Sequence, residues 1–160
     1  LGDVYKRQDL HCSYTREQLL VAMDFMKPSI VREGVKWLPD KNIDVFFITL
    51  NKSDKDYSPT TMYQDYSINE TLFHWQSQST TNAEGKVGQR YINHRKNGSK
   101  VLLFVREFKN DIYGNTAPYT YLGTANYVSH NGSRPMNITW KLDDPIPAKY
   151  LKKTNKLVVG

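Results

Sequence analysis

The sequence predicts an α+β fold, in which one N-terminal helix precedes a curved, mainly antiparallel β-sheet or a small β-barrel. Three observations lead to this prediction. Segments rich in β-branched and aromatic residues follow one another along the chain, Asn-Gly turns separate several of them, and no helices alternate with strands as a parallel α/β sheet requires. Only one segment, near the N-terminus, has apolar residues at helical spacing.

That segment begins with Thr15 and Gln18, which have the spacing of a capping box. In such a box each side chain accepts a hydrogen bond from the backbone N–H of the other residue. Apolar residues at helical spacing follow, and then Pro28, a residue common just beyond a helix end. We therefore expect a helix from about residue 15 to Met26.

The first strands are expected at residues 34–39 and 43–50, which are rich in β-branched and aromatic residues. Residues 51–69 are polar and turn-forming, and Pro59 excludes a central strand there. Because long loops on compact domains are usually functional, this loop is a candidate contact surface.

The stretch LFHWQSQS that follows is expected to be another strand. Side chains alternate between the two faces of a strand, so Phe73 and Trp75 share one face while His74, Gln76 and Gln78 share the other. Carboxamides are poor core groups because their donors and acceptors all need partners. They are well suited to pairing with the edges of DNA bases.

Two Asn-Gly pairs predict hairpins, because they supply the positive φ angles of tight turns. The first hairpin pairs residues 90–94 with residues 101–108, and the second pairs residues 119–130 with residues 136–143. Gly123, inside a strand, predicts a β-bulge or a close approach of two backbones.

The chain has 160 residues, a formal net charge of +6 and a pI of about 9.3, which suits a single basic domain with a polyanionic partner. No apolar run approaches the ~20 residues of a membrane-spanning helix, and the first residues lack the pattern of a secretory signal. The single Cys12 cannot form an internal disulfide, which agrees with a reducing compartment. We therefore expect a cytoplasmic protein without membrane contact.

The opening LGDVYKRQ does not start with Met and fits no element that follows it, so the chain is expected to be a fragment. We expect residues 1–13 to be a non-native or disordered lead, residues 14–157 to form one domain, and residues 158–160 to be a tail.

The sequence lacks a GxxxxGK[ST] phosphate loop and the spacing of zinc ligands, so no cofactor or metal is expected in this chain. One alternative is a metal-dependent nuclease. Glu107 and Lys109 have the E-x-K spacing of restriction nucleases, with Asp65 as the upstream acid. Such a short motif is common by chance.

A non-catalytic nucleic-acid interface accounts for more of the polar and aromatic residues than the nuclease alternative does. Carboxamide and aromatic side chains on exposed sheet faces or pocket walls can pair with bases or stack on them, while nearby cations hold phosphates. The candidate nucleic-acid-binding residues are His74, Trp75, Gln76, Gln78, Gln89, Arg90, Tyr91, Asn93, Arg95, Lys96, Asn126 and Tyr127.

Several long blocks, among them ETLFHWQSQS, GQRYINH, VLLFVRE and APYTYLGTANYVSH, occur in the order found in one family. From Tyr14 to Leu157 the chain closely resembles the C-terminal domain of unknown function of bacterial superfamily II (DEAD/DEAH-type) helicases that carry an N-terminal phospholipase D-like nuclease domain. That domain is similar in layout to PUA-like and SRA-like β-barrels, which recognise modified or flipped bases.

The resemblance implies a DNA-recognition module of a restriction or defence protein, not an enzyme by itself, with duplex DNA and the helicase and nuclease domains of the parent chain as partners. ATP and Mg²⁺ are expected only for the motor of that parent. His74, Trp75, Gln76 and Gln78 would line the recognition pocket, with Gln76 contacting the base. A module that docks on the motor or on another protein through residues 51–69, without touching DNA, is the other alternative.

Overall fold

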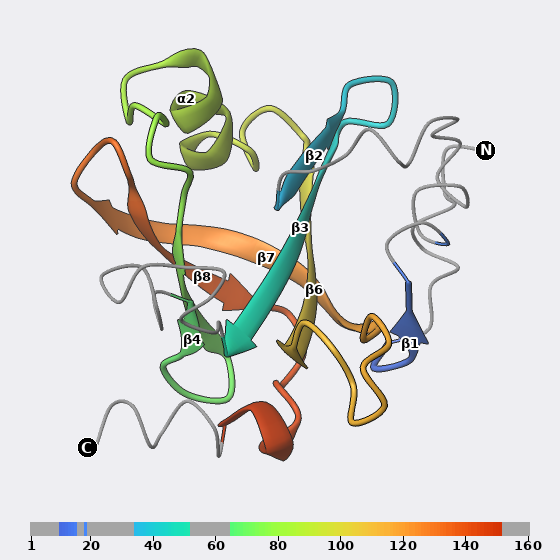
Figure 1. Ribbon diagram of the computed structural model, residues 1–160. Helices are drawn as coiled ribbons and strands as arrows, with labels where there is room; N and C mark the ends of the chain where they lie inside the picture. The colour runs from blue at the N-terminus through green and yellow to red at the C-terminus, as the bar shows by residue number, and fades with distance from the viewer. Residues whose placement is uncertain (1–9, 16–17, 19–33, 52–64, 152–160) are drawn as a thin grey trace.

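The computed structural model describes residues 10–15, 18, 34–51 and 65–151. These residues form an eight-stranded sheet and the helix α2, so the fold is mostly β rather than α+β (Figure 1). The elements are β1 (Ser13–Tyr14), β2 (Val35–Leu38), β3 (Ile43–Asn51), β4 (Tyr66–Ser67), β5 (Leu72–Gln76), α2 (Lys86–Ile92), β6 (Lys100–Phe108), β7 (Tyr119–Asn131) and β8 (Asn137–Leu142).

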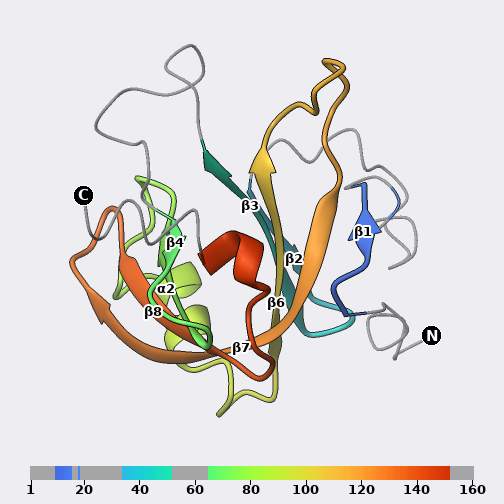
Figure 2. The ribbon, with the colours of Figure 1, turned by 90° about the horizontal axis from the view of Figure 1, so that it is seen from below.

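The strands lie in the order β2-β3-β6-β7-β8-β5-β4, and β1 pairs with β7 outside this path. All neighbours are antiparallel except β3 and β6, which are parallel. A parallel pair needs a long connection, and this one contains β4, β5 and α2. The sheet is therefore mixed and open, so the curved sheet is observed rather than the closed barrel (Figures 1 and 2).

The sheet curves so that β3 and β5 face each other across the core, although three strands separate them in the strand order. Phe46 of β3 stacks on Trp75 of β5, with ring centroids 4.2 Å apart. Tyr91 of α2 and Trp140 of β8 both contact Phe46 edge-on. These four buried side chains form the centre of the main core and fix α2 on it.

A second apolar cluster covers the other face of β3 and β6. It contains Val45 and Phe47 of β3 together with Leu102 and Phe104 of β6. Because both faces are covered, each of these strands is a nearly continuous apolar run, which is typical of parallel strands. The strands predicted for these two segments are confirmed.

The bulge predicted at Gly123 is present. The pairing passes from Leu103 with Gly123 to Phe104 with Tyr121, so Leu122 is the extra residue. Gly123 has a φ of 96°, and a Cβ there would lie 3.2 Å from a carboxylate oxygen of Asp144. Both reasons for glycine, the positive φ and the close contact, therefore apply at this position.

The hairpin predicted between residues 119–130 and 136–143 is confirmed, since β7 and β8 pair as far as Asn131 and Asn137. The hairpin predicted from residues 90–94 is wrong, because this segment forms the end of α2 and the turn after it.

Helical spacing explains that error. Gly88, Tyr91 and His94 are buried and recur at every third position, as on one face of a helix. The adjacent aromatic and β-branched residues Tyr91 and Ile92, followed by Asn97-Gly98, favour a strand and hairpin and hide this longer period. Gly98, with a φ of 73°, lies in the turn between α2 and β6 and does not connect two strands.

The predicted N-terminal helix, from residue 15 to Met26, lies outside the described residues except at its start. Its capping box is present: the Thr15 N–H donates to Gln18 Oε1 at 3.0 Å, and the Gln18 N–H donates to Thr15 Oγ1 at 3.1 Å. Residues 52–64 of the predicted loop also lie outside the described part of the chain.

Residues near the N-terminus join the sheet. The His11 N–H donates to the Tyr121 carbonyl at 2.8 Å, and the Tyr121 N–H donates to the Cys12 carbonyl at 3.2 Å. Ser13 and Tyr14 continue this pairing as β1. Residues 11–13 of the expected lead are thus hydrogen-bonded to β7 or paired with it.

Gly88 lies where α2 meets the loop before it, and a Cβ at this position would lie 2.2 Å from the Asn82 carbonyl oxygen. We expect Gly88→Ala to lower the free energy of unfolding by about 1–3 kcal/mol, because overpacking outweighs the better helix propensity of alanine. Urea unfolding followed by circular dichroism measures the change. Val87→Ala, at an exposed position of the same helix, is the control. Equal stability of the two variants would contradict the packing argument.

Candidate nucleic-acid interface

A pocket of about 470 Å³ lies beside α2, and we call it the α2 pocket. Three cations, four carboxamides, one indole and one hydroxyl line it, and none of its described lining residues is acidic. The lining residues are Trp37, Asn42, Lys86, Gln89, Arg90, Asn93, Lys96, Asn97 and Ser99. They come from β2, the β2–β3 turn, α2 and the segment that leads to β6.

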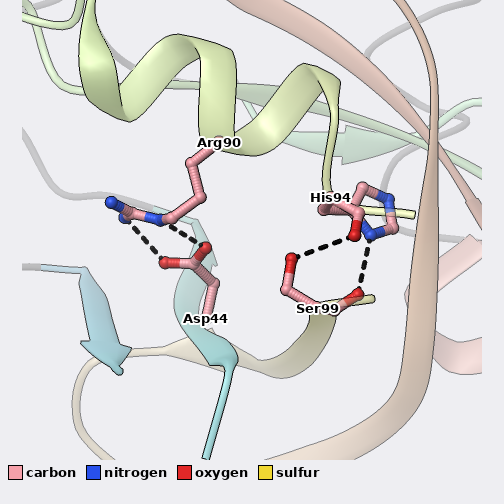
Figure 3. A network of polar contacts seen from close by, with 4 residues as sticks. All are labelled: Asp44, Arg90, His94 and Ser99. Atoms are coloured by element: carbon pink, nitrogen blue, oxygen red, sulfur yellow. Dashed lines mark hydrogen bonds and ion pairs between the residues drawn. The ribbon is translucent and has the colours of Figure 1, made fainter. Parts of the chain in front are cut away.

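Arg90 and Asp44 form a buried ion pair beside the pocket (Figure 3). Arg90 Nε and Nη2 donate to the two carboxylate oxygens of Asp44, each at 2.9 Å. The guanidinium also lies over Trp37, 4.4 Å from the ring centroid. Burial raises the pKa of Asp44 above its usual value, while the hydrogen bonds and charge of Arg90 oppose this rise. The pair therefore fixes Arg90 and the indole beside it.

The remaining cations of the pocket are Lys86 and Lys96. Both are exposed, and neither has an ion-pair partner in the part of the chain that the structure describes. Because the charge of Arg90 is already balanced by Asp44, the uncompensated positive charge of the pocket comes from these two lysines. Arg95 and Lys100 are exposed nearby and line a smaller neighbouring pocket of about 130 Å³.

Hydrogen bonds hold the carboxamides of the α2 pocket in place. Gln89 Nε2 donates to the Ala83 carbonyl at 2.9 Å, and Asn93 Nδ2 donates to Gln89 Oε1 at 3.0 Å. Asn42 Nδ2 donates to the Asn97 carbonyl at 3.3 Å. These side chains are oriented before any ligand arrives, which reduces the entropy lost on binding.

His94 and Arg95 complete the edge of β7. His94 Nδ1 lies 3.2 Å from the Ser99 carbonyl oxygen (Figure 3). On the other side of the ring, the Tyr127 N–H donates to His94 Nε2 at 3.0 Å. Arg95 Nη2 donates to the Tyr127 carbonyl at 3.1 Å. The two side chains thus satisfy the Tyr127 backbone as a neighbouring strand would. His94 can accept at Nε2 only when it is neutral and carries its proton on Nδ1.

The predicted residues of β5 lie on a different surface. Trp75 was predicted to line the recognition pocket but is buried in the core with Phe73, whereas His74 and Gln76 face the opposite side of the strand. His74 stacks on Tyr66 with ring centroids 4.7 Å apart, and Gln76 Nε2 donates to Asn137 Oδ1 at 3.3 Å. Both contacts are cross-strand pairs that stabilise the sheet.

The structure therefore divides the twelve predicted residues. Four of them line the α2 pocket: Gln89, Arg90, Asn93 and Lys96. The others have different surroundings. Trp75 and Tyr91 are core residues, Arg95 and Tyr127 contact each other at the edge of β7, and Asn126 binds the Lys141 carbonyl and Asp143. Gln78 is exposed beyond the end of β5, while His74 and Gln76 lie on the outer face of that strand.

Five residues of the pocket were not predicted from the sequence: Trp37, Asn42, Lys86, Asn97 and Ser99. A signal existed for Lys86, which lies three and four positions before Gln89 and Arg90 and so shares one face of a helix with them. No local pattern points to Trp37 or Asn42, because the fold alone brings the β2–β3 connection to α2.

The described residues contain no group of three or more His, Cys, Asp or Glu side chains that could hold a metal ion. Asp65, the acid proposed to assist Glu107 and Lys109, accepts a hydrogen bond from the Gln76 N–H at 2.8 Å. In the described ranges, no helix has the length and apolar character needed to cross a membrane.

The Asp44–Arg90 pair gives a stability prediction. Asp44→Asn leaves the guanidinium of Arg90, which is only 19% exposed, without a counter-charge. We expect the free energy of unfolding to fall by about 3 kcal/mol, as is usual when one partner of a buried pair is removed. The double variant Asp44→Leu with Arg90→Met removes both charges and should recover most of this loss. Wild-type stability of Asp44→Asn in urea would contradict a structural role of the pair.

His94 gives a pH prediction. Burial lowers the pKa of His94 below its usual value of 6.5, so the unfolded chain binds the proton more readily than the folded one. The free energy of unfolding should therefore decrease as the pH falls below about 6.5. Urea unfolding between about pH 7.5 and pH 5.5 tests this. His94→Gln, which cannot titrate, should be less stable but should have a flatter pH dependence. Equal slopes for both proteins would mean that His94 does not cause the effect.

Comparison with curated proteins returns no match. Comparison with protein families gives one match, to a family described as "Domain of unknown function (DUF3427)", and it covers residues 9–153. This confirms the part of the resemblance that concerns a domain of unknown function. The chain belongs to the DUF3427 family.

Proposed function

We propose that the domain binds duplex DNA through the α2 pocket and acts as a recognition module rather than as an enzyme. One observation carries this proposal: the described lining of the pocket combines lysines, carboxamides and an indole with no acidic group. The described lining of the α2 pocket thus has no carboxylate to repel a phosphate, and it has groups that pair with base edges.

Phosphate contacts would come from the cations. Lys86 and Lys96 are exposed at the pocket, and Arg95 and Lys100 extend the positive surface beside it. Asp143 also lines the smaller pocket, but its carboxylate accepts hydrogen bonds from Thr124 and Asn126. The net charge of +6 favours the same kind of partner.

Base contacts would come from the carboxamides and from the stacked pair beside them. Bases stack on indole rings and on guanidinium planes, and Trp37 and Arg90 form such a pair with its orientation fixed by Asp44. Gln89 and Asn93, held by hydrogen bonds, can present donors and acceptors to a base edge. The pocket volume of about 470 Å³ lies in the usual range for small-molecule sites, so it suits a modified or flipped base.

The resemblance to the C-terminal domain of bacterial DEAD/DEAH-type helicases supports a finer proposal. In it, the domain directs a helicase with a nuclease domain to its DNA substrate, as in a cytoplasmic restriction or defence protein. ATP and Mg²⁺ would then serve the motor, and no residue of this chain would hold them. The proposal also includes a likeness in layout to PUA-like and SRA-like domains, which recognise modified or flipped bases.

DNA binding is measured by fluorescence anisotropy of the full chain with labelled duplexes at two salt concentrations. Plain, methylated, hydroxymethylated and phosphorothioated duplexes identify the preferred base. We expect the double variant Lys86→Ala with Lys96→Ala to bind about tenfold more weakly, because two phosphate contacts are lost. The slope of the logarithm of the binding constant against the logarithm of the salt concentration should also become less steep by about two.

The control is the double variant Lys141→Ala with Lys149→Ala, which makes the same change in net charge at exposed residues outside the pocket. It should bind nearly as the wild type does. If both double variants lose the same affinity, only overall charge matters and the α2 pocket is not the site. If Gln76→Ala with Gln78→Ala removes the preference for a modified base and Gln89→Ala with Asn93→Ala does not, the base is recognised at β5 instead.

A further inference from the structure

The connection between β6 and β7, residues 109–118, is a hairpin-like loop that projects beyond the sheet, and we call it the ribbon (Figure 2). Asn110 and Thr116 pair across it, and the Ala117 N–H donates to the Lys109 carbonyl at 2.9 Å. Nearer the tip, the Asp111 N–H donates to the Asn115 carbonyl at 2.8 Å. The ribbon therefore has a conformation set by its own hydrogen bonds.

Two large apolar side chains at the tip are almost fully exposed to solvent. Ile112 is 90% exposed and Tyr113 is 82% exposed, the highest values among large apolar residues in the described part of the chain. Removing such groups from water is favourable, so a hydrogen-bonded tip that exposes both indicates a contact with another molecule.

The polar groups around the tip narrow the class of that molecule. Asn110 and Asn115 flank the apolar pair and are exposed. Asp111, the carboxylate nearest the tip, accepts hydrogen bonds from the N–H groups of Tyr113 and Asn115, each at 2.9 Å. Both hydrogen bonds end on Oδ1, so the turn satisfies one oxygen of this exposed carboxylate. An apolar tip with carboxamides on both sides fits the minor groove of DNA, where apolar wedges separate base steps and Asn side chains contact base edges.

We infer that the ribbon tip is a wedge that inserts Ile112 and Tyr113 between base pairs from the minor groove. This inference rests on the proposed DNA-binding function and adds a second contact to it. The α2 pocket lies near the start of β6 and the ribbon follows its end. A strand of nine residues spans about 30 Å, close to one turn of duplex DNA, so the two contacts would fall about one helical turn apart on a single duplex.

The test uses the full chain and a duplex of about 20 base pairs with 2-aminopurine at successive positions, since its fluorescence rises when a base unstacks. Wild-type protein should raise the fluorescence at one base step. Ile112→Ser with Tyr113→Ser should abolish this rise and weaken binding roughly tenfold, with an unchanged salt dependence because no cation is removed. Val128→Ser, which alters another apolar side chain that is 50% exposed, should match the wild type.

The possible results separate the wedge from the proposed function. Wild-type protein that binds no duplex at low salt would overturn DNA binding and the wedge together. A second result would overturn the wedge alone: DNA binding depends on Lys86 and Lys96, but wild type and tip variant give the same 2-aminopurine fluorescence. The proposed role of the α2 pocket in DNA binding would then stand. If the tip variant binds DNA normally but loses self-association in sedimentation runs, the tip contacts protein and the wedge is wrong. Circular dichroism should give equal unfolding for both proteins, since the substituted side chains are exposed.

Discussion

The stack of Phe46 on Trp75 is the contact on which the rest of the architecture depends. It joins the second and the sixth strand of the seven-strand path, so the sheet must curve to make it. Once the sheet is curved, Tyr91 and Trp140 can pack edge-on against the same ring. Aromatic pairs of this kind contribute about 0.5–1.5 kcal/mol each beyond the burial of their area. Tyr91 belongs to α2, so the cluster that closes the core also positions the helix.

Polar contacts then fix which way α2 faces. Arg90 binds Asp44 on β3, and His94 with Arg95 binds the Tyr127 backbone on β7. Buried pairs of charges add little net stability, because their desolvation offsets their attraction, but a wrong orientation would leave each group unpaired. The apolar cluster thus gives α2 its stability, and the polar partners give it a single orientation. In that orientation, four side chains of the helix and the residue after it line the pocket: Lys86, Gln89, Arg90 and Asn93.

The two ends of β6 differ in chemistry. Near its start lie the lysines and carboxamides of the α2 pocket, and beyond its end lies the apolar ribbon tip. Charge attracts a polyanion from a distance but does not distinguish one base from another, whereas a wedge and a preorganised pocket act only in close contact. The proposed recognition function would use both kinds of contact, and β6 joins the two places where they would be made.

The local features could be predicted from the sequence: the strands β3, β6 and β8, the β7–β8 hairpin, the bulge at Gly123 and the capping box of Thr15. Each depends on neighbouring residues, whose spacing and backbone preferences can be recognised in one segment. Only the tertiary structure decided that β3 pairs in parallel with β6, that residues 86–92 are a helix, and that Trp37 and Asn42 join it in one pocket. These features arise from packing between segments far apart in the chain. The local sequence of one segment does not indicate which distant segment will pack against it.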